Sequence, residues 1–287
     1  MANIQERLLI VRLHISKWNP WGYDKEAARK VAETEGSKSE DVHTTKRKIS
    51  KDAVKEIIDI MQKAYAYHVS NTMPTGGEND RIITTDHYPQ YCEKMEDFKR
   101  QVNEALDKFV PTYPQWVEEA RTRLGNLFKP GDYPDVTQIR SKFSMTYNFL
   151  PFPSADNLVL NLVNGELSRV RESVTAEMNR MSNTAMKSLW DRTYDSVAHM
   201  SEILGAETRT RITSAMVDNM KTLCNVLQGL NFNNDPELES LRMKIESRLA
   251  GVNPEDLRKN RTLRMEVAAE AKAITFEISE KRKLRLE

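Results

Sequence analysis

The sequence predicts a mainly α (α+β) protein, in which a small antiparallel sheet is packed by helices and followed by an elongated helical hairpin or bundle. Two short segments alternate apolar and polar residues, as half-buried strands do. Most of the remaining chain repeats apolar residues every three or four positions, as amphipathic helices do. Glycine and proline are scarce, at 10 and 11 of 287 residues, which favours long helices over a turn-rich fold.

The two strand-like segments lie far apart in the sequence. Residues 141–153, SKFSMTYNFLPFP, place bulky side chains at every second position, and residues 9–16 alternate in the same way. The bulky residues of the first segment are Phe143, Met145, Tyr147 and Phe149. Because each strand needs a pairing edge, and the cost of closing a loop grows only with the logarithm of its length, we predict that both share one sheet. RIITT at 81–85 is a weaker third strand, and helices are expected to cover the apolar face.

Helices are predicted between these strands. Ser50 is placed to cap a helix of about twenty residues. Pro89 suits the first turn of the next helix. Pro111 is expected to end that helix and Pro114 to start a shorter one, because proline inside a helix removes a hydrogen bond.

The segment before the first of these helices is rich in aromatic and polar residues. Trp18, Trp21 and Tyr23 are expected to plug one end of the small sheet, with a recognition patch as the alternative. Residues 35–48, EGSKSEDVHTTKRK, are predicted to form a mobile loop that ends in a short basic run.

A long helix is predicted after Pro153. Its apolar positions follow an eleven-residue period, which favours a nearly straight coiled-coil type of pairing. Fifty residues of helix extend about 75 Å, whereas a compact chain of this size has a radius of gyration of about 19 Å. The helix is therefore expected to project and to offer part of its stripe to a partner. The candidate interface residues are Val159, Val163, Leu167, Val170, Val174, Met178, Met181 and Leu189.

The remaining C-terminal chain is predicted to be helical. Gly205 suits a helix end, and residues 208–228 are expected to return as the second arm of a hairpin. Asp235 and Asn253 each precede a proline and an acid, which is typical of a helix start. The predicted domains are an α+β head at 1–153 and an elongated helical bundle at 154–287.

No recognisable catalytic pattern occurs in the sequence. None of the five histidines has a carboxylate or a second histidine at metal-ligand spacing, and TGGENDR at 75–81 lacks the lysine of a phosphate-binding loop. No catalytic, cofactor-binding or metal-binding residue is therefore assigned, no cofactor is expected, and the balance favours a protein that is not an enzyme. An active site built from dispersed acids with His14 or His87 stays open.

Two basic clusters are the strongest sign of a nucleic-acid partner. The net charge of +1 gives no overall attraction to a polyanion, so only local patches matter. The candidate nucleic-acid-binding residues near the two ends of the last helix are Arg258, Lys259, Arg261, Arg264, Lys281, Arg282, Lys283 and Arg285.

The sequence also suggests a cellular setting. Cys92 and Cys224 have no redox or metal spacing, and no stretch has the length and apolar character of a membrane span, so we expect a cytoplasmic protein without membrane contact. The order of ISKWNPWGYD, KRKIS, YPQW and FSMTYNFLPFP before long helices resembles an uncharacterised phage-encoded family, a domain of unknown function. The resemblance implies a phage protein in the host cytoplasm and supplies no catalytic residues.

The sequence as a whole favours a non-enzymatic interaction or scaffold protein that oligomerises or docks a protein partner through its long amphipathic helices. The alternative is a nucleic-acid-binding protein of phage DNA metabolism that uses the C-terminal basic clusters.

Overall fold

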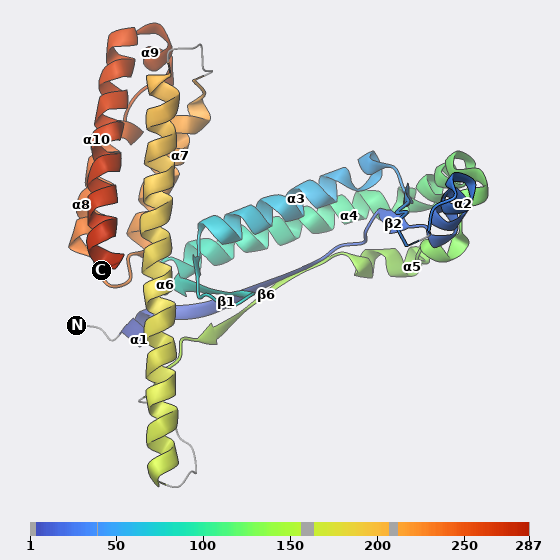
Figure 1. The fold of residues 1–287 in the computed structure, drawn as a ribbon, viewed down its shortest axis with the longest axis horizontal. Helices are drawn as coiled ribbons and strands as arrows, with labels where there is room; N and C mark the ends of the chain where they lie inside the picture. The colour runs from blue at the N-terminus through green and yellow to red at the C-terminus, as the bar shows by residue number, and fades with distance from the viewer. Residues whose placement is uncertain (1–3, 39, 156–163, 207–211, 287) are drawn as a thin grey trace. The chain divides into compact units, whose positions relative to one another are not determined.

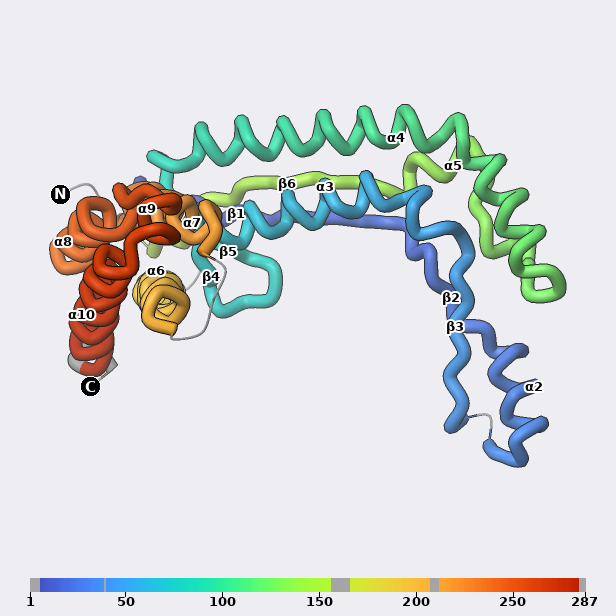
Figure 2. Tube along the Cα trace, turned by 90° about the horizontal axis from the view of Figure 1, so that it is seen from above, coloured from blue at the N-terminus to red at the C-terminus, as the bar shows by residue number. Residues whose placement is uncertain are grey.

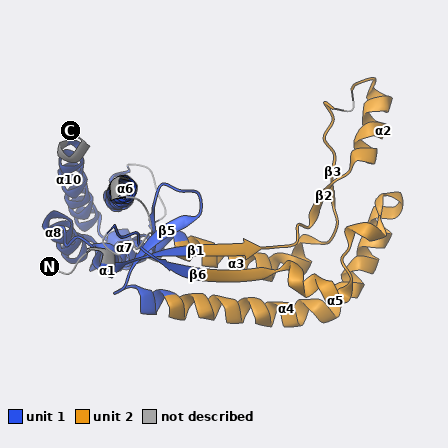
Figure 3. Cartoon of the chain, turned by 90° about the horizontal axis from the view of Figure 1, so that it is seen from below, with its two compact units in different colours: residues 1–12, 69–91, 148–287 blue, residues 13–68, 92–147 orange. Residues whose placement is uncertain are grey.

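A computed structural model shows a mainly helical α+β fold, as predicted (Figure 1). The residues that it describes are 4–38, 40–155, 164–206 and 212–286. The chain forms two compact units (Figure 3). Unit 1 comprises residues 1–12, 69–91 and 148–287, and unit 2 comprises residues 13–68 and 92–147.

These units are not divided at residue 153. Long-range hydrogen bonds tie early segments to the C-terminal helices within unit 1: Arg7 donates to the carbonyl of Phe232 at 2.7 Å, and Thr84 donates to the carbonyl of Gly229. The division of the chain into a head at 1–153 and a helical bundle at 154–287 stays a prediction.

A four-stranded sheet joins the distant strands, as the sequence predicted. Its order is β4 (Met73–Pro74), β5 (Asp80–Thr84), β1 (Leu8–Ser16) and β6 (Ser144–Pro151). Strands β1 and β5 are antiparallel, with a register that runs from Leu8 opposite Thr84 to Arg12 opposite Asp80. The weaker candidate at 81–85 is thus confirmed as the strand between β4 and β1.

The core of unit 1 is built around one long helix, α6 (Asn164–Gly205), which ends at the predicted glycine. The other helices of this unit are α1 (Ile4–Arg7), α7 (Ser214–Leu230), α8 (Pro236–Ile245), α9 (Pro254–Lys259) and α10 (Arg261–Leu286). Helix α10 runs antiparallel along the C-terminal half of α6, since Arg282 pairs with Asp191 while Ser201 donates to the carbonyl of Ala268. Leu189, Val197 and Leu204 of α6 are fully buried by this packing.

The predicted helix starts are confirmed by their caps. The Asp235 carboxylate accepts from the backbone amides of Glu237 and Leu238 at the start of α8, and the Asn253 side chain accepts from Glu255 at the start of α9. These side chains satisfy amides that have no partner within the helix. A π-helical turn, Glu246–Ala250, follows α8.

Unit 2 contains α3 (Lys51–Ser70), which starts beside Ser50 as predicted, and the longer α4 (Tyr88–Leu124). The expected breaks at Pro111 and Pro114 are wrong, because α4 continues through both. Between the two prolines, Thr112 donates its hydroxyl to the carbonyl of Phe109 at 3.0 Å. Helix α4 changes direction toward its C-terminal end (Figure 2), as proline-containing helices do.

The rest of unit 2 was largely missed by the sequence reasoning. Helix α2 (Lys25–Glu35) begins at an Asp24 cap, and the short strands β2 (Trp21–Tyr23) and β3 (Thr45–Arg47) form a separate antiparallel ribbon. Strand β3 lies in the segment that was expected to be a mobile loop. The short elements after α4 are Gly125–Leu127, Pro130–Asp132, α5 (Val136–Ile139) and Arg140–Lys142.

Candidate functional site

The residues of the predicted interface stripe on α6 are buried to different extents along the helix. Met181 and Leu189 are buried in the core of unit 1, so the chain itself covers them, which corrects the expectation that they face a partner. Met178 packs at the edge of that core. Leu167, Val170 and Val174 are half-buried and lie outside it, and the predicted positions Val159 and Val163 lie outside the described residues.

The first turns of α6 therefore differ from the rest of the helix. They extend beyond the C-terminal helices of unit 1 (Figure 1). Leu167, Val170 and Val174 follow one another at steps of three and four, so they share one face. An apolar stripe on a helix is stable in water when another apolar surface covers it. This half-exposed stripe is the first candidate interaction surface.

The C-terminal basic clusters are largely neutralised. Their ion pairs within the described chain are Lys259 with Glu255, Lys281 with Glu237, Arg282 with Asp191 and Lys283 with Glu280. Arg258 donates to the carbonyl of Ile212 at 2.7 Å. Arg261 and Arg264 have no ion pair among the described residues, and the side chain of Arg285 is not described. Phosphate binding needs several cations with little opposing charge, so the structure adds no support for this predicted site.

A groove of about 540 Å³ lies between α6 and α7 in unit 1. Asp195, Ser196 and His199 line its α6 side, and Met216 and Met220 line its α7 side. Within the described contacts, no hydrogen bond joins Asp195, Ser196 and His199. A nucleophile needs a base within hydrogen-bond reach, so the groove does not contain an assembled catalytic set.

Arg192, a cation that lines this groove, already donates hydrogen bonds to backbone carbonyls. Arg192 donates to the carbonyl of Ser70 at 3.1 Å and to the carbonyl of Thr72 at 2.7 Å. Burial, followed by the neighbouring charge of Arg81, lowers the pKa of Arg192 to about 10. The side chain remains charged at neutral pH and anchors the chain before β4 to α6.

The two histidines that were considered for catalysis have different environments. His14 is exposed on β1, whereas His87 is buried and lies 3.0 Å from the Asn71 side-chain oxygen. Burial lowers the pKa of His87, which therefore stays neutral at pH 7. No group of three or more histidine, cysteine, aspartate or glutamate residues in the described part of the chain is arranged to hold a metal ion.

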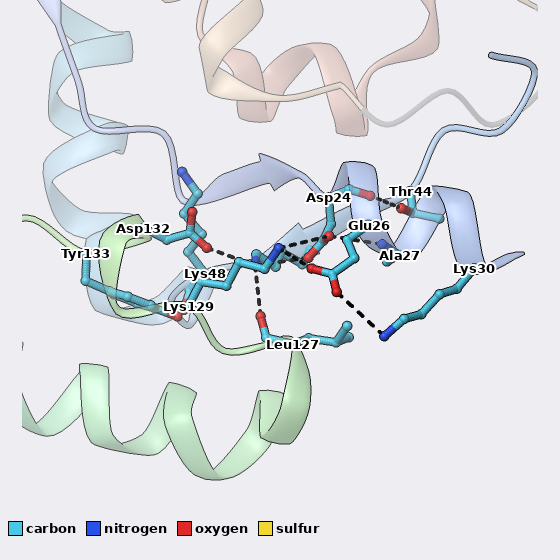
Figure 4. Close-up of polar contacts among 11 residues, drawn as sticks. Asp24, Glu26, Ala27, Lys30, Thr44, Lys48, Leu127, Lys129, Asp132 and Tyr133 are labelled. Carbon is cyan, nitrogen blue, oxygen red and sulfur yellow. Dashed lines mark hydrogen bonds and ion pairs between the residues drawn. The ribbon is translucent and has the colours of Figure 1, made fainter. Parts of the chain in front are cut away.

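A buried ion cluster supports the β2–β3 ribbon of unit 2 (Figure 4). Lys46 is 7% exposed, and its ammonium lies 3.0 Å from the Asp24 carboxylate and 2.8 Å from the Asp132 carboxylate. It also donates to the carbonyl of Leu127 at 2.8 Å. The contacts with Asp24, Asp132 and Leu127 join α2, the ribbon and the segment after α4.

The carboxylates of this cluster have Lys46 as their shared charge partner. Asp24 Oδ2 and Asp132 Oδ2 are buried, and no described residue gives either atom a well-aligned hydrogen bond. The Ala27 amide, followed by the Lys46 side chain, lowers the pKa of Asp24 against the effect of burial. Burial alone would lower the pKa of Lys46, but Asp132 and Asp24 outweigh it and raise that pKa. The cluster is therefore charged at neutral pH and lacks a free acid or base.

The aromatic residues near this cluster divide into two groups. Trp18 is buried and makes an edge contact with Tyr113 at 6.0 Å between ring centroids, so it packs inside unit 2. Trp21 and Tyr23 are 45% and 46% exposed on the ribbon. The recognition-patch alternative thus applies to these two residues, and the three-residue alternation W-G-Y is too short a signal to identify their strand from the sequence.

No protein-family model matches the chain, and no curated protein or solved structure proved similar to it. The resemblance to a phage-encoded family stays a prediction. No helix within the described ranges has both the length and the apolar character needed to cross a membrane.

Proposed function

We propose that this protein is a non-enzymatic interaction or scaffold protein that associates with a second copy of itself through the first turns of α6. The observation that carries the proposal is the half-exposed stripe of Leu167, Val170 and Val174, which lies outside the core of unit 1 as far as its described residues define that core.

The stripe is complementary to itself in an antiparallel arrangement. When Val170 of one copy is placed opposite Val174 of the other, Leu167 falls one residue from the position opposite Met178, so the four apolar residues approximately match about a two-fold axis near residue 172. In this arrangement, Arg169 falls within two residues of Glu177 in the second copy. Antiparallel pairing also lets the two helices meet without a change in the core.

The expected affinity is modest. Full burial of a Leu, Val or Met side chain removes roughly 60 to 120 Å² from water, so four of them supply at most about 400 Å² per copy. A standard stable interface buries about 800 Å² per partner. We therefore expect a dimer that forms in the micromolar range and dissociates on dilution. The phage origin and the cytoplasmic setting remain part of this proposal, and they rest on the sequence alone.

Sedimentation velocity over a concentration series tests the proposal. The wild-type chain should shift from monomer to dimer as concentration rises, and Val170→Glu with Val174→Glu should remain a monomer because four charges would meet at the two-fold axis. Ser168→Glu with Thr175→Glu adds the same charge on other, exposed faces of α6 and should dimerise like the wild type. A wild-type chain that stays monomeric at every concentration would refute the proposal, and equal dimerisation of both variants would exclude this surface.

A further inference from the structure

The β2–β3 ribbon of unit 2 has one buried face and one exposed face. Its register places Trp21 opposite Arg47 and Tyr23 opposite Thr45. Because strand side chains alternate, these four residues share the face opposite Lys46, whose ammonium is held in the buried ion cluster. Hydrogen bonds from Lys48 to Pro20 at 2.7 Å and from Asp24 to Thr44 at 3.0 Å extend the pairing at both ends. The exposed face is therefore carried by a supported backbone.

The two exposed aromatic rings are already oriented by neighbours. The Arg47 guanidinium lies 4.6 Å from the centroid of the Trp21 ring, and the His43 ring lies 5.5 Å from the Tyr23 ring. The exposed fractions of 45% and 46% leave about half of Trp21 and Tyr23 accessible. Each ring thus has one neighbour in place and open surface on which a planar group can stack.

Two cations border this face without a carboxylate partner among the described residues. They are Arg47 and Arg123. Arg123 donates to the carbonyl of Arg47 at 3.1 Å, which places its guanidinium at the ribbon edge. Lys48 lies on the opposite face with Lys46, because its side chain crosses Gly22, the residue that pairs with Lys46. These charges contrast with the C-terminal clusters, where most cations are paired with acids.

We infer that the exposed face of the β2–β3 ribbon binds single-stranded nucleic acid, with Trp21 and Tyr23 stacking on bases and Arg47 and Arg123 contacting phosphates. Aromatic platforms bordered by cations bind single strands in this way, with little dependence on sequence. Residues two apart on a strand are separated by about 6.6 Å. This is about twice the 3.4 Å rise per nucleotide of a duplex strand, so the two rings suit the splayed bases of an extended strand.

The composition of the face favours a nucleic acid over a protein partner. Its ring-facing residues are two aromatics, a threonine, an arginine and a histidine, so stacking rings stand beside basic groups and none of these five residues is an acid that would repel a phosphate. The inference is independent of the proposed self-association, because the ribbon belongs to unit 2 and α6 belongs to unit 1.

Fluorescence anisotropy with a labelled oligo-dT of about 20 nucleotides tests the inference on the full-length chain. We expect binding that weakens roughly 7-fold between 50 and 200 mM salt, since two phosphate contacts to a single strand give a logarithmic slope of about −1.4. A duplex of the same length should bind more weakly. Trp21→Ala and Tyr23→Ala should each reduce the affinity by about 5- to 150-fold, the range for loss of one base-stacking ring.

Two further variants separate stacking from a structural effect. Trp21→Phe keeps a ring but removes the indole, so it should retain binding within a few fold while losing the quenching of tryptophan fluorescence that oligo-dT causes. Arg261→Glu with Arg264→Glu changes the C-terminal cluster and should bind like the wild type. Absence of oligo-dT binding at low salt would overturn the inference. So would binding that survives Trp21→Ala and Tyr23→Ala together, or binding that only the C-terminal variant removes.

Discussion

Replacement of Lys46 by methionine should destabilise unit 2 strongly. Methionine keeps an apolar stem of similar length but removes the charge that faces Asp24 Oδ2 at 3.0 Å and Asp132 Oδ2 at 2.8 Å. At an effective dielectric of about 20, each attraction is worth about 5 to 6 kcal/mol before desolvation. Removal of one partner from a buried ion pair costs about 3–5 kcal/mol net. The Asp132 side chain is 28% exposed, so water offsets part of its loss.

Urea unfolding followed by circular dichroism, together with hydrogen exchange of the β2–β3 amides, measures this effect. Lys46→Met should lower the urea midpoint and reduce protection of the ribbon first, because the cluster holds β3 to α2 and to the segment after α4. Adding Asp24→Asn and Asp132→Asn should restore most of the loss, since no buried charge is then left unpaired and asparagine still caps a helix.

The pH dependence should follow from the two pKa shifts. The contribution of Asp24, whose pKa is lowered in the fold, is present above its usual pKa and is lost as the pH falls through the folded-state value. The contribution of Lys46, whose pKa is raised, is fully present below its usual pKa of 10.5 and is lost as the pH rises through the folded-state value. Lys30→Met, which removes an exposed pair with Glu26, is the matched control and should have little effect. A Lys46→Met chain with wild-type stability and exchange would refute the reasoning.

Three smaller predictions concern unit 1. Gly229→Ala should lower the melting temperature, because its Cβ would lie 2.7 Å from Nδ1 of buried His87 and such overpacking costs about 1–3 kcal/mol; unchanged melting would show that His87 can move aside. Asp235→Ala should cost about 1 kcal/mol in chemical denaturation through loss of the α8 cap, while Asp235→Asn should be nearly neutral; equal losses would contradict the capping role. Cys224 is buried, and burial raises its pKa to about 11. It should therefore resist a thiol reagent in the native chain and react after unfolding, as peptide mapping can measure. Rapid labelling of the native chain would disprove its burial.

Local signals accounted for the elements that the sequence predicted. Alternation identified β1 and β6, and the need for a pairing edge placed them side by side in the sheet. Asp235 and Asn253 marked helix starts because an N-cap acts on amides only two or three residues away. Gly205 marked the end of α6 in the same local way.

The errors arose where tertiary contacts outweigh local preference. Pro111 and Pro114 each disfavour a helix interior by about 3 kcal/mol or more, but burial of Phe109 and Tyr113 against the rest of unit 2 favours continuation of the helix. The β2–β3 ribbon was missed because three-residue strands contain too little alternation to distinguish them from a loop.

The candidate interaction surfaces also depend partly on local sequence and partly on tertiary contacts. The sequence by itself determined that α6 is a long helix with an apolar stripe, because a helical repeat is a property of consecutive residues. Only the tertiary structure decided that Met181 and Leu189 are buried while Val170 and Val174 are half-exposed. It also decided that Lys281 and Arg282 are paired with acids, whereas Arg47 and Arg123 have no acid partner among the described residues. Exposure and charge pairing depend on which distant residues fold against a side chain, and no local pattern contains that information.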